Sequence, residues 1–467
     1  MSKFSITSIP TDQDYAFSRA GLAHYLRLGF LPAPYSVFSN ELLVNDYGQG
    51  FSETADPKKP GFHRDLRQFV GVRRYESDPK FDEAKALDLI EQNLLDCVAR
   101  DTEGYDRIFL MISGGKDSLS VAWALRELNK SVTLLHCTNR GREDETADVK
   151  VAAEKLGFDV HFLPDNIHDV DPILKARAGK LSAPIADIAF FSYVCAVAKI
   201  IQILDETQEG KAILLDGMGN DAYMGHICGA REKKLVRLPH LPFLSEGMVS
   251  LAYGHNFGHY ALETLFKPRE ERQFSGAGFA VGGKPIAPQT PQIFQQYQDH
   301  PEERRALMRG GIFDVDCCMR KGVLAAELDD RIDIAFPFFD ASWIGIYEQF
   351  PTEVMFDYDA SFNKKLLRTF LKRSGVSSEF VFSQKGSFRF NLDQVSEVYQ
   401  PSAVVIDLLA QMGIGKRSVE KLAQQGKDNF VAAQKYGMLY ALDRFLQARD
   451  LPAGMARNEP LAITYGV

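Results

Sequence analysis

A buried strand that runs into a glycine turn places the strongest constraint on this chain. Ile108 to Ile112 carries no charged or polar side chain, which is typical of a strand covered on both faces of a parallel sheet. The turn from Ser113 to Gly115 follows, and the pattern over Leu119 to Leu128 predicts a helix. A glycine turn at a helix N-terminus leaves backbone N–H groups pointing outward, so the sequence predicts an anion site, and phosphate is the natural occupant.

The turn reads Ser-Gly-Gly-Lys-Asp-Ser, which we call the SGGKDS motif. It has neither the GxxxxGK[ST] spacing nor the GxGxxG spacing of common nucleotide-binding loops. Asp117 stands inside the predicted anion site, where it would repel phosphate unless a divalent cation lay between them, so we expect Mg²⁺. A glycine turn without any ligand is the simpler alternative. The motif residues that we expect to bind the nucleotide are Ser113, Gly114, Gly115, Lys116, Asp117 and Ser118.

The SGGKDS motif resembles the pyrophosphate loop of the PP-loop ATP pyrophosphatases, which cleave ATP into AMP and pyrophosphate. This resemblance implies ATP and Mg²⁺ as cofactors. It also implies that Lys116 contacts the departing phosphates.

Strand and helix patterns alternate around the motif. The expected helices are 81–100, 119–128 and 146–156, and the expected strands are 108–112, 131–139, 158–163 and 212–215. This order predicts an α/β fold with a doubly wound parallel sheet, which the resemblance identifies as adenine nucleotide alpha hydrolase-like, with ligands at the carboxyl ends of the strands. We expect His136, near the end of the second strand, to line the adenine pocket as a wall and not as a catalyst.

The 467 residues are 45% hydrophobic, which is enough for more than one buried core. We expect an N-terminal helix and linker-like extension over 1–80 and a nucleotide-binding domain over 81–290. A largely helical part over 291–467 would close over the active site.

Composition limits the setting and the partners. A net charge of −8 without a dense basic stripe argues against nucleic acid. No apolar run approaches the roughly 18 residues of a membrane span, and Met1 to Tyr15 lacks a signal-peptide pattern. The six cysteines show no CxxC spacing, so we expect a reducing cytoplasm.

A second motif, Gly217 to Asp221, follows the strand 212–215 and is called the GMGND motif. The sequence LLDGMGNDAYMGH around it resembles the L-S-G-x-G-S-D-x-x-x-G-G loop of asparagine synthetases and β-lactam synthetases. The resemblance implies that Asp221 and Asp117 hold Mg²⁺ together and that Gly217 belongs to the nucleotide site. An aspartate that only caps the next helix is the alternative for Asp221.

Three positions depart from that family. Met218 stands where an acidic residue or tyrosine usually helps proton transfer, Ala222 replaces a glutamate, and Asp216 replaces a small serine. The ATP-binding half therefore matches while the acceptor half is altered, so we expect an acyl substrate other than aspartate.

Two further regions resemble the same family. DIAFPFFD, which ends at Asp340, resembles the E-x-R-x-P-F-x-D element, with Asp333 at the glutamate position and Ala335 in place of arginine. Asp333 is our candidate for a general base or a carboxylate that orients the amine, and a surface or helix-capping aspartate is the alternative. Downstream, NKKLLRTFLKRSGVSSEFVFSQKGSFRF resembles the K-x-L-L-R helix and the R-x-K-x-G-F loop, so Lys385 is our candidate for stabilising charge on the α-phosphate. A solvated loop lysine is the alternative for Lys385.

The resemblance implies an ATP-dependent carbon–nitrogen ligase that adenylates a small-molecule carboxylate and passes the acyl group to ammonia or an amine. Asparagine synthetases begin with a glutaminase domain whose nucleophile is an N-terminal cysteine, whereas this chain starts Met-Ser-Lys. We therefore expect nitrogen from free ammonia, an amine or a separate glutaminase, and a homo-oligomer stays open. Two alternatives remain, a PP-loop sulfurtransferase and a catalytically silent nucleotide-binding subunit.

Overall fold

The structure is a computed structural model, and it describes the chain in separate ranges. These are residues 4–10, 15–46, 54–55, 62–63, 77–138, 145–187, 189–224, 280–281, 284–285, 308–357, 362–376, 390–451 and 455.

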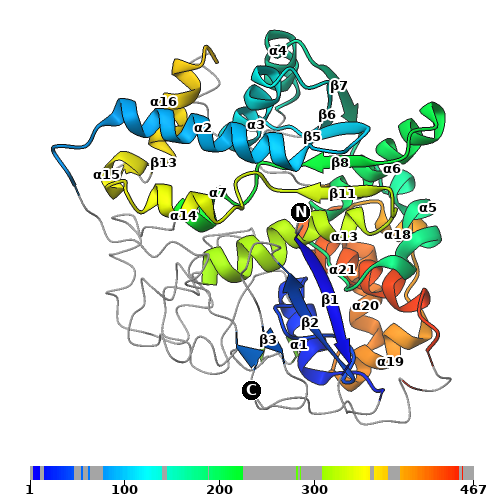
Figure 1. The fold of residues 1–467 in the computed structure, drawn as a ribbon. Coiled ribbons are helices and arrows are strands. Elements are labelled where there is room, and N and C mark those ends of the chain that lie inside the picture. Colours follow the sequence, from blue (N-terminus) through cyan, green and yellow to red (C-terminus); the bar gives the residue numbers. More distant parts are fainter. Residues whose placement is uncertain are drawn as a thin grey trace.

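A five-stranded parallel sheet in the order β11-β8-β5-β6-β7 forms the centre of the fold (Figure 1). The chain builds outward from β5 to β7, then returns to add β8 and β11 on the other side of β5. The order thus reverses between β5 and β8, which is where open α/β sheets bind ligands. The predicted α/β fold with a doubly wound parallel sheet is confirmed. The strands are β5 (Arg107–Met111), β6 (Val132–Cys137), β7 (Asp159–Leu163), β8 (Ala212–Leu215) and β11 (Ile332–Ala335).

Helices pack around the sheet in two groups. In the first, α2 contacts α3 and both contact α16, while α4 packs against α3; in the second, α6 contacts α5 and α13, and α13 contacts β11. The helices of these groups are α2 (Glu83–Asp101), α3 (Lys116–Glu127), α4 (Thr146–Leu156), α5 (Ile167–Arg177), α6 (Phe190–Thr207), α13 (Arg320–Ala326) and α16 (Lys365–Arg373). The remaining longer helices are α1 (Arg19–Leu28), α19 (Ala403–Gln411), α20 (Lys416–Gln425) and α21 (Phe430–Gln447).

Short elements connect these parts. The π-helix η3 (Met308–Met319) leads into α13, and the short helices are η2 (Ala178–Lys180), α7 (Asn220–Met224), α14 (Ser342–Tyr347), α15 (Thr352–Met355) and α18 (Val395–Val398). Six short strands form two-stranded sheets: β3 (Thr54–Ala55) with β4 (Phe62–His63), β9 (Ala280–Val281) with β10 (Lys284–Pro285), and β12 (Phe356–Asp357) with β13 (Phe362–Asn363).

The sheet crosses the domain boundary that the sequence predicted at residue 290. Its edge strand β11 lies in the part that we expected to be largely helical, yet it pairs with β8 from Ile332 opposite Ala212 to Ala335 opposite Leu215. The apolar side chains of Ile332 and Ile334 are buried, which explains why this short segment completes the sheet.

The N-terminal segment packs on the C-terminal part. Strand β1 (Ser5–Pro10) pairs antiparallel with β2 (Glu41–Asp46), and α1 begins after the N-cap Ser18 and ends at Gly29, whose φ is 81°. Helix α1 is tied to α21 because the Tyr25 hydroxyl donates to the Met438 carbonyl at 2.8 Å. The predicted helix of the N-terminal extension is confirmed.

A buried ion pair connects β2 with η3 and α13. The Arg320 guanidinium donates to Asp316 at 2.9 Å and to Asn45 at 2.6 Å, and all three side chains are almost fully buried. Asn45 in turn donates to Asp316 at 2.8 Å. The pair is therefore both desolvated and hydrogen-bonded, the condition under which a buried charge is tolerated.

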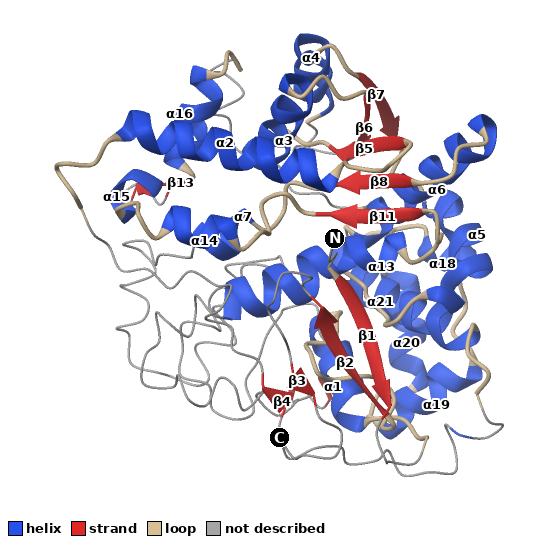
Figure 2. Cartoon of the chain, in the orientation of Figure 1, coloured by secondary structure: helices blue, strands red, loops and turns tan. Residues whose placement is uncertain are grey.

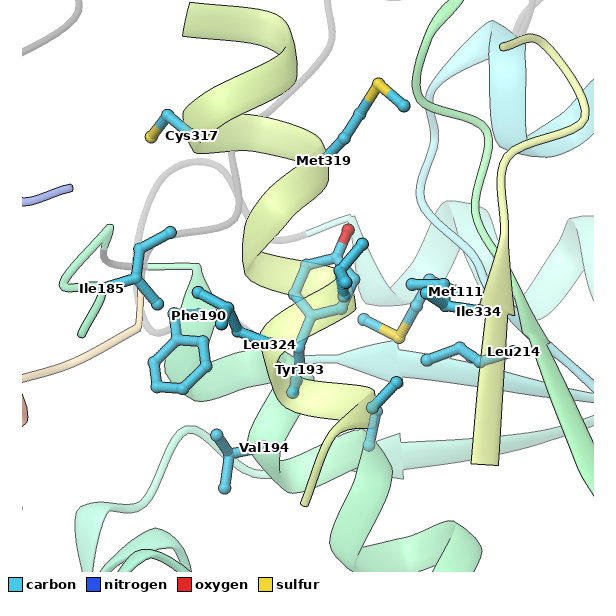
Figure 3. Close-up of a cluster of buried hydrophobic side chains, with 14 of the residues drawn as sticks. Met111, Ile185, Phe190, Tyr193, Val194, Leu214, Cys317, Met319, Leu324 and Ile334 are labelled. Carbon is cyan, nitrogen blue, oxygen red and sulfur yellow. The ribbon is translucent and has the colours of Figure 1, made fainter. Parts of the chain in front are cut away.

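The core beneath the sheet is apolar and shared by α6, α13 and the strands. Figure 3 shows Met111, Leu214 and Ile334 of the strands facing Tyr193 of α6 and Leu324 of α13. Among the described residues, no helix is both long enough and apolar enough to cross a membrane.

Candidate functional site

The SGGKDS motif lies where the strand order of the sheet reverses. Strand β5 ends at Met111, the turn follows, and α3 begins at Lys116, three residues earlier than the sequence pattern predicted. The N-cap Gly115 has no side chain to cap the first turn of α3, so the site keeps backbone donors. In Figure 2 the arrowheads of β8 and β11 point to the side on which α7, α14 and α16 lie.

Two serines shape the motif from inside. Ser118 Oγ lies 3.1 Å from the carbonyl oxygens of both Ser113 and Gly115, and it accepts the Ser113 N–H at 3.2 Å. The Gly115 N–H donates to Ser113 Oγ at 3.1 Å. Both serines are buried, so in this structure they hold the turn in shape. Direct contact between the serines and a nucleotide stays a prediction.

The backbone of Gly114 is engaged by two charged side chains. Its N–H donates to Glu145 Oε2 at 2.8 Å, and its carbonyl accepts from Lys116 Nζ at 3.4 Å. A carboxylate oxygen therefore occupies a donor of the turn, which is direct evidence that this backbone accommodates anionic oxygen.

The GMGND motif packs against the SGGKDS motif with no room for a side chain. A Cβ on Gly217 would lie 2.5 Å from the Ser118 nitrogen and 2.7 Å from the Asp117 carbonyl carbon. Gly219 has a φ of 101°, and a Cβ there would lie 2.6 Å from Phe339 Cβ. Gly217 is therefore needed for the close approach of the two motifs, and Gly219 for the approach of the GMGND motif to Phe339.

Asp117 and Asp221, the predicted metal pair, lie on either side of one cation. The ammonium group of Lys364 pairs with Asp117 and also lies 3.2 Å from Asp221 Oδ1. Asn220 Nδ2 donates to Asp117 Oδ1 at 2.8 Å, and the Tyr347 hydroxyl donates to Asn220 Oδ1 at 2.5 Å. In the described structure a lysine ammonium, not a metal ion, therefore lies between the two carboxylates, and their role in holding Mg²⁺ stays a prediction.

The environment of Lys364 favours its charged form. Burial by itself lowers the pKa of this amine, but the carboxylates of Asp117 and Asp221 more than offset burial and raise the pKa above its usual value. Lys364 therefore carries a full positive charge at neutral pH.

The donor set fits Mg²⁺ bound together with a nucleotide. Among the described residues, no three His, Cys, Asp or Glu side chains surround one metal position. Two carboxylates that converge on one cation are, however, the hard oxygen ligands that Mg²⁺ uses alongside substrate phosphates. Asp117 and Asp221 would hold the ion, which would neutralise charge on the phosphates.

Asp216 fixes the GMGND motif from below. The Tyr193 hydroxyl donates to Asp216 Oδ2, and the Met218 N–H donates to Asp216 Oδ1 at 2.8 Å. Tyr193 and Asp216 are both buried, and burial raises the pKa of the Tyr193 phenol well above its usual value, with Asp216 adding to the shift. Asp216 is therefore anchored to α6. The side chain of Ala222 is fully buried.

The structure does not bring Asp333, our candidate base, to this site. Asp333 is the second residue of β11, level with Ile213 at the start of β8, and it accepts a hydrogen bond from Tyr105 at 2.8 Å. In a parallel sheet this amino end lies opposite the edge that carries both motifs. A carboxylate at that end can tie β11 to the segment before β5, but it cannot reach the motif residues.

The other predicted residues fall in two groups. His136 lies in β6 with Nδ1 donating to the Ile112 carbonyl at 2.9 Å, so it is buried directly beside the SGGKDS motif, and its place in an adenine pocket stays a prediction. Lys385 lies outside the described residues, and its role stays a prediction.

Sequence reasoning missed Lys364 and Glu145. Lys364 is the first residue of the K-x-L-L-R pattern, which was noticed as a helix signal but not as a source of a site residue. Glu145 belongs to an acidic turn whose residues look equally solvated in sequence. Both contact the SGGKDS motif from residues that are distant in sequence, so only the tertiary structure assigns them.

Four of the five described cysteines are poorly placed for sulfur chemistry. Burial raises the pKa of Cys97 and of Cys137 to about 12, and it raises those of Cys195 and Cys317 well above the usual value. These four thiols are therefore weak nucleophiles.

No family model matches the chain. Over 222 residues the chain is 22% identical to the putative glutamine-hydrolyzing asparagine synthetase 2 of Methanocaldococcus jannaschii, which covers 46% of this chain and 40% of that protein. The chain thus spans well under half the length of this curated relative. Among solved structures, the NMN synthetase from Francisella tularensis is similar over 31% of this chain and 58% of its own, at 13% identity and a TM-score of 0.23.

Proposed function

We propose that the chain is an ATP-dependent synthetase that activates a carboxylate as an acyl-adenylate, releases pyrophosphate, and passes the acyl group to ammonia or an amine. The observation that carries this proposal is the convergence of Asp117 and Asp221 on one cation beside the SGGKDS motif. The partial similarity to a putative asparagine synthetase supports the same reaction class.

The proposal gives roles to the residues around the SGGKDS motif. The Gly114 N–H, which accommodates a carboxylate oxygen, would bind a phosphate oxygen, and the N-terminus of α3 would add its dipole. Lys116 and Lys364 would place positive charge near the pyrophosphate leaving group. Charge neutralisation of this kind is the main protein contribution in reactions at phosphorus.

The acyl acceptor side differs from that of asparagine synthetases. Met218 offers no proton acceptor, so the incoming nitrogen nucleophile would lose its proton elsewhere, to solvent or to the phosphate group of the departing AMP. An activated acyl-adenylate reacts readily with a positioned amine, and positioning with water excluded supplies much of the rate. We therefore propose a substrate carboxylate other than aspartate.

The test is isotope exchange between labelled pyrophosphate and ATP across a panel of carboxylic acids with Mg²⁺. Exchange that requires one class of acid, and that falls when ammonium or an amine consumes the adenylate, is the expected result. Asp117→Asn is the matched control because it removes one charge and keeps the side-chain shape. No acid-dependent exchange by a protein that binds ATP would overturn the proposal.

A further inference from the structure

Two charged side chains of the protein contact the same groups that the nucleotide and its cation are proposed to contact. Glu145 accepts the Gly114 N–H at 2.8 Å, where the proposed function places a phosphate oxygen. Lys364 lies between Asp117 and Asp221, where the proposed function places Mg²⁺. One internal anion and one internal cation thus compete with the two ligands.

We propose that Glu145 and Lys364 are further residues of the nucleotide site that make binding of the nucleotide and binding of the divalent cation cooperative. The inference rests on the proposed function. It adds that the nucleotide and the divalent cation each bind weakly without the other, because either ligand alone leaves a charged group of the site without an opposite charge beside it.

Lys364 cannot withdraw far when a cation arrives. It precedes α16, which packs on α2 and α3, and Phe370 of α16 meets Trp123 of α3 at a centroid distance of 4.7 Å. The lysine is itself only 8% exposed. A divalent cation that bound alone would therefore push a buried ammonium off both carboxylates with no anion to receive it, which is unfavourable.

A nucleotide supplies that missing anion. Once phosphates lie against the SGGKDS motif, the displaced Lys364 ammonium can pair with them while the cation takes Asp117 and Asp221. A nucleotide without a cation meets the opposite difficulty, since it must displace the Glu145 carboxylate and then face the Asp117 carboxylate. Coupling between two ligands is reciprocal, so each raises the affinity of the other by the same factor.

The test measures binding only, with the full chain. Mn²⁺ binding, followed by electron paramagnetic resonance of the free ion, is measured with and without α,β-methylene-ATP, whose α–β bond the site cannot cleave. We expect wild type to bind Mn²⁺ at least about fivefold more tightly with the analogue. Lys364→Met should bind Mn²⁺ alone at least about fivefold more tightly than wild type and lose most of the coupling. Lys372→Met, which alters an exposed lysine of the same helix, should behave as wild type.

Equal Mn²⁺ affinity and equal coupling in wild type and Lys364→Met would overturn the role of Lys364. Should that variant fail to fold, Lys364→Arg keeps a cation between the carboxylates and is expected to retain coupling. Absence of coupling in wild type overturns the inference without any variant.

Glu145→Gln tests the anionic half separately. It should bind the analogue without a divalent cation about threefold more tightly than wild type, because the neutral amide oxygen of glutamine accepts the Gly114 N–H more weakly than a carboxylate does and does not repel phosphate. An unchanged affinity would overturn the role of Glu145. If no protein bound the analogue, the proposed function itself would fail, whereas the comparison of Mn²⁺ alone would still decide whether Lys364 blocks the carboxylate pair.

Discussion

Lys364 pairs with Asp117 across 247 residues of sequence, and this contact connects the residue before α16 with the first turn of α3. Asp221, in the first turn of α7, converges on the same ammonium, so a single cation links the N-terminal ends of three helices. The charge balance of the site therefore depends on segments that are distant in sequence, and substitutions in these segments should change stability and nucleotide binding.

Replacement of Asp117 by Asn should abolish ATP cleavage and weaken the fold. The neutral amide leaves Lys364 with Asp221 alone, which should cost about 3 kcal/mol of unfolding free energy, the lower range for a buried pair that loses one partner. Urea unfolding measures this cost. Asp330→Asn removes a carboxylate whose side chain is 87% exposed and should leave both stability and activity nearly unchanged. Equal effects of the two substitutions would contradict the site.

Gly217→Ala should disrupt the contact between the two motifs. The new Cβ would lie 2.5 Å from the Ser118 nitrogen, which is backbone and cannot rotate away, so the loops must separate. We expect a loss of about 1–3 kcal/mol in stability and a marked loss of nucleotide binding. Gly345→Ala in α14 is the matched control, because a Cβ there meets nothing within 4 Å and helix propensity should make it neutral or slightly stabilising. Nucleotide binding by Gly217→Ala as tight as that of Gly345→Ala would show that this close approach is not needed.

Tyr193→Phe should loosen the GMGND motif without unfolding the protein. Asp216 would keep the Met218 N–H and lose its hydroxyl partner, at a cost of about 1–3 kcal/mol. We expect a raised KM for the nucleotide or the acid. Tyr436→Phe removes another buried hydroxyl, which donates to the Tyr399 carbonyl at 3.2 Å, and it should lower stability without changing KM. A wild-type KM in Tyr193→Phe would show that the hydrogen bond from Tyr193 to Asp216 is not needed for substrate binding.

The pH dependence of stability should carry a contribution from Glu327. Burial raises the pKa of its carboxyl from 4.5 to about 7, although the Ser182 N–H and hydroxyl donate to it and oppose the shift. Because the folded pKa is the higher one, the stabilisation is fully present below about pH 4.5 and is lost as the pH rises toward 7. Glu327→Gln should lack this loss, so its stability relative to wild type should improve between these pH values. A constant difference between the two proteins across that window would contradict the shift.

Local patterns predicted the sheet and the two motifs well. The strand 108–112 and the turn after it are consecutive in sequence, and their chemistry is local, so the position of the SGGKDS motif at the strand end followed directly. The resemblance to the synthetase loop paired Asp221 with Asp117, and this pairing agrees with a parallel sheet, in which the carboxyl ends of the strands share one edge. Both aspartates do meet at a common cation.

The remaining features of the site depend on strand register and on contacts between residues that are distant in sequence. Asp333 was assigned to the site from its spacing to Pro337 and Asp340. It lies near the amino end of the four-residue strand β11, however, whereas the site lies at the carboxyl ends of the strands. The domain boundary at 290 failed to include β11 for the same reason, since a short strand in a helical context has little signal of its own. Lys364 and Glu145 reach the site through tertiary packing that no local pattern records.

The most direct test of the central claim is phosphorus-31 NMR of ATP and Mg²⁺ incubated with the protein, mixed carboxylic acids and ammonium. Adenylation predicts that AMP and pyrophosphate appear in equal amounts, that both need the acids, and that Asp117→Asn forms neither. Formation of ADP and phosphate instead, or acid-independent turnover, would contradict a site that cleaves ATP between its α and β phosphates to activate a carboxylate.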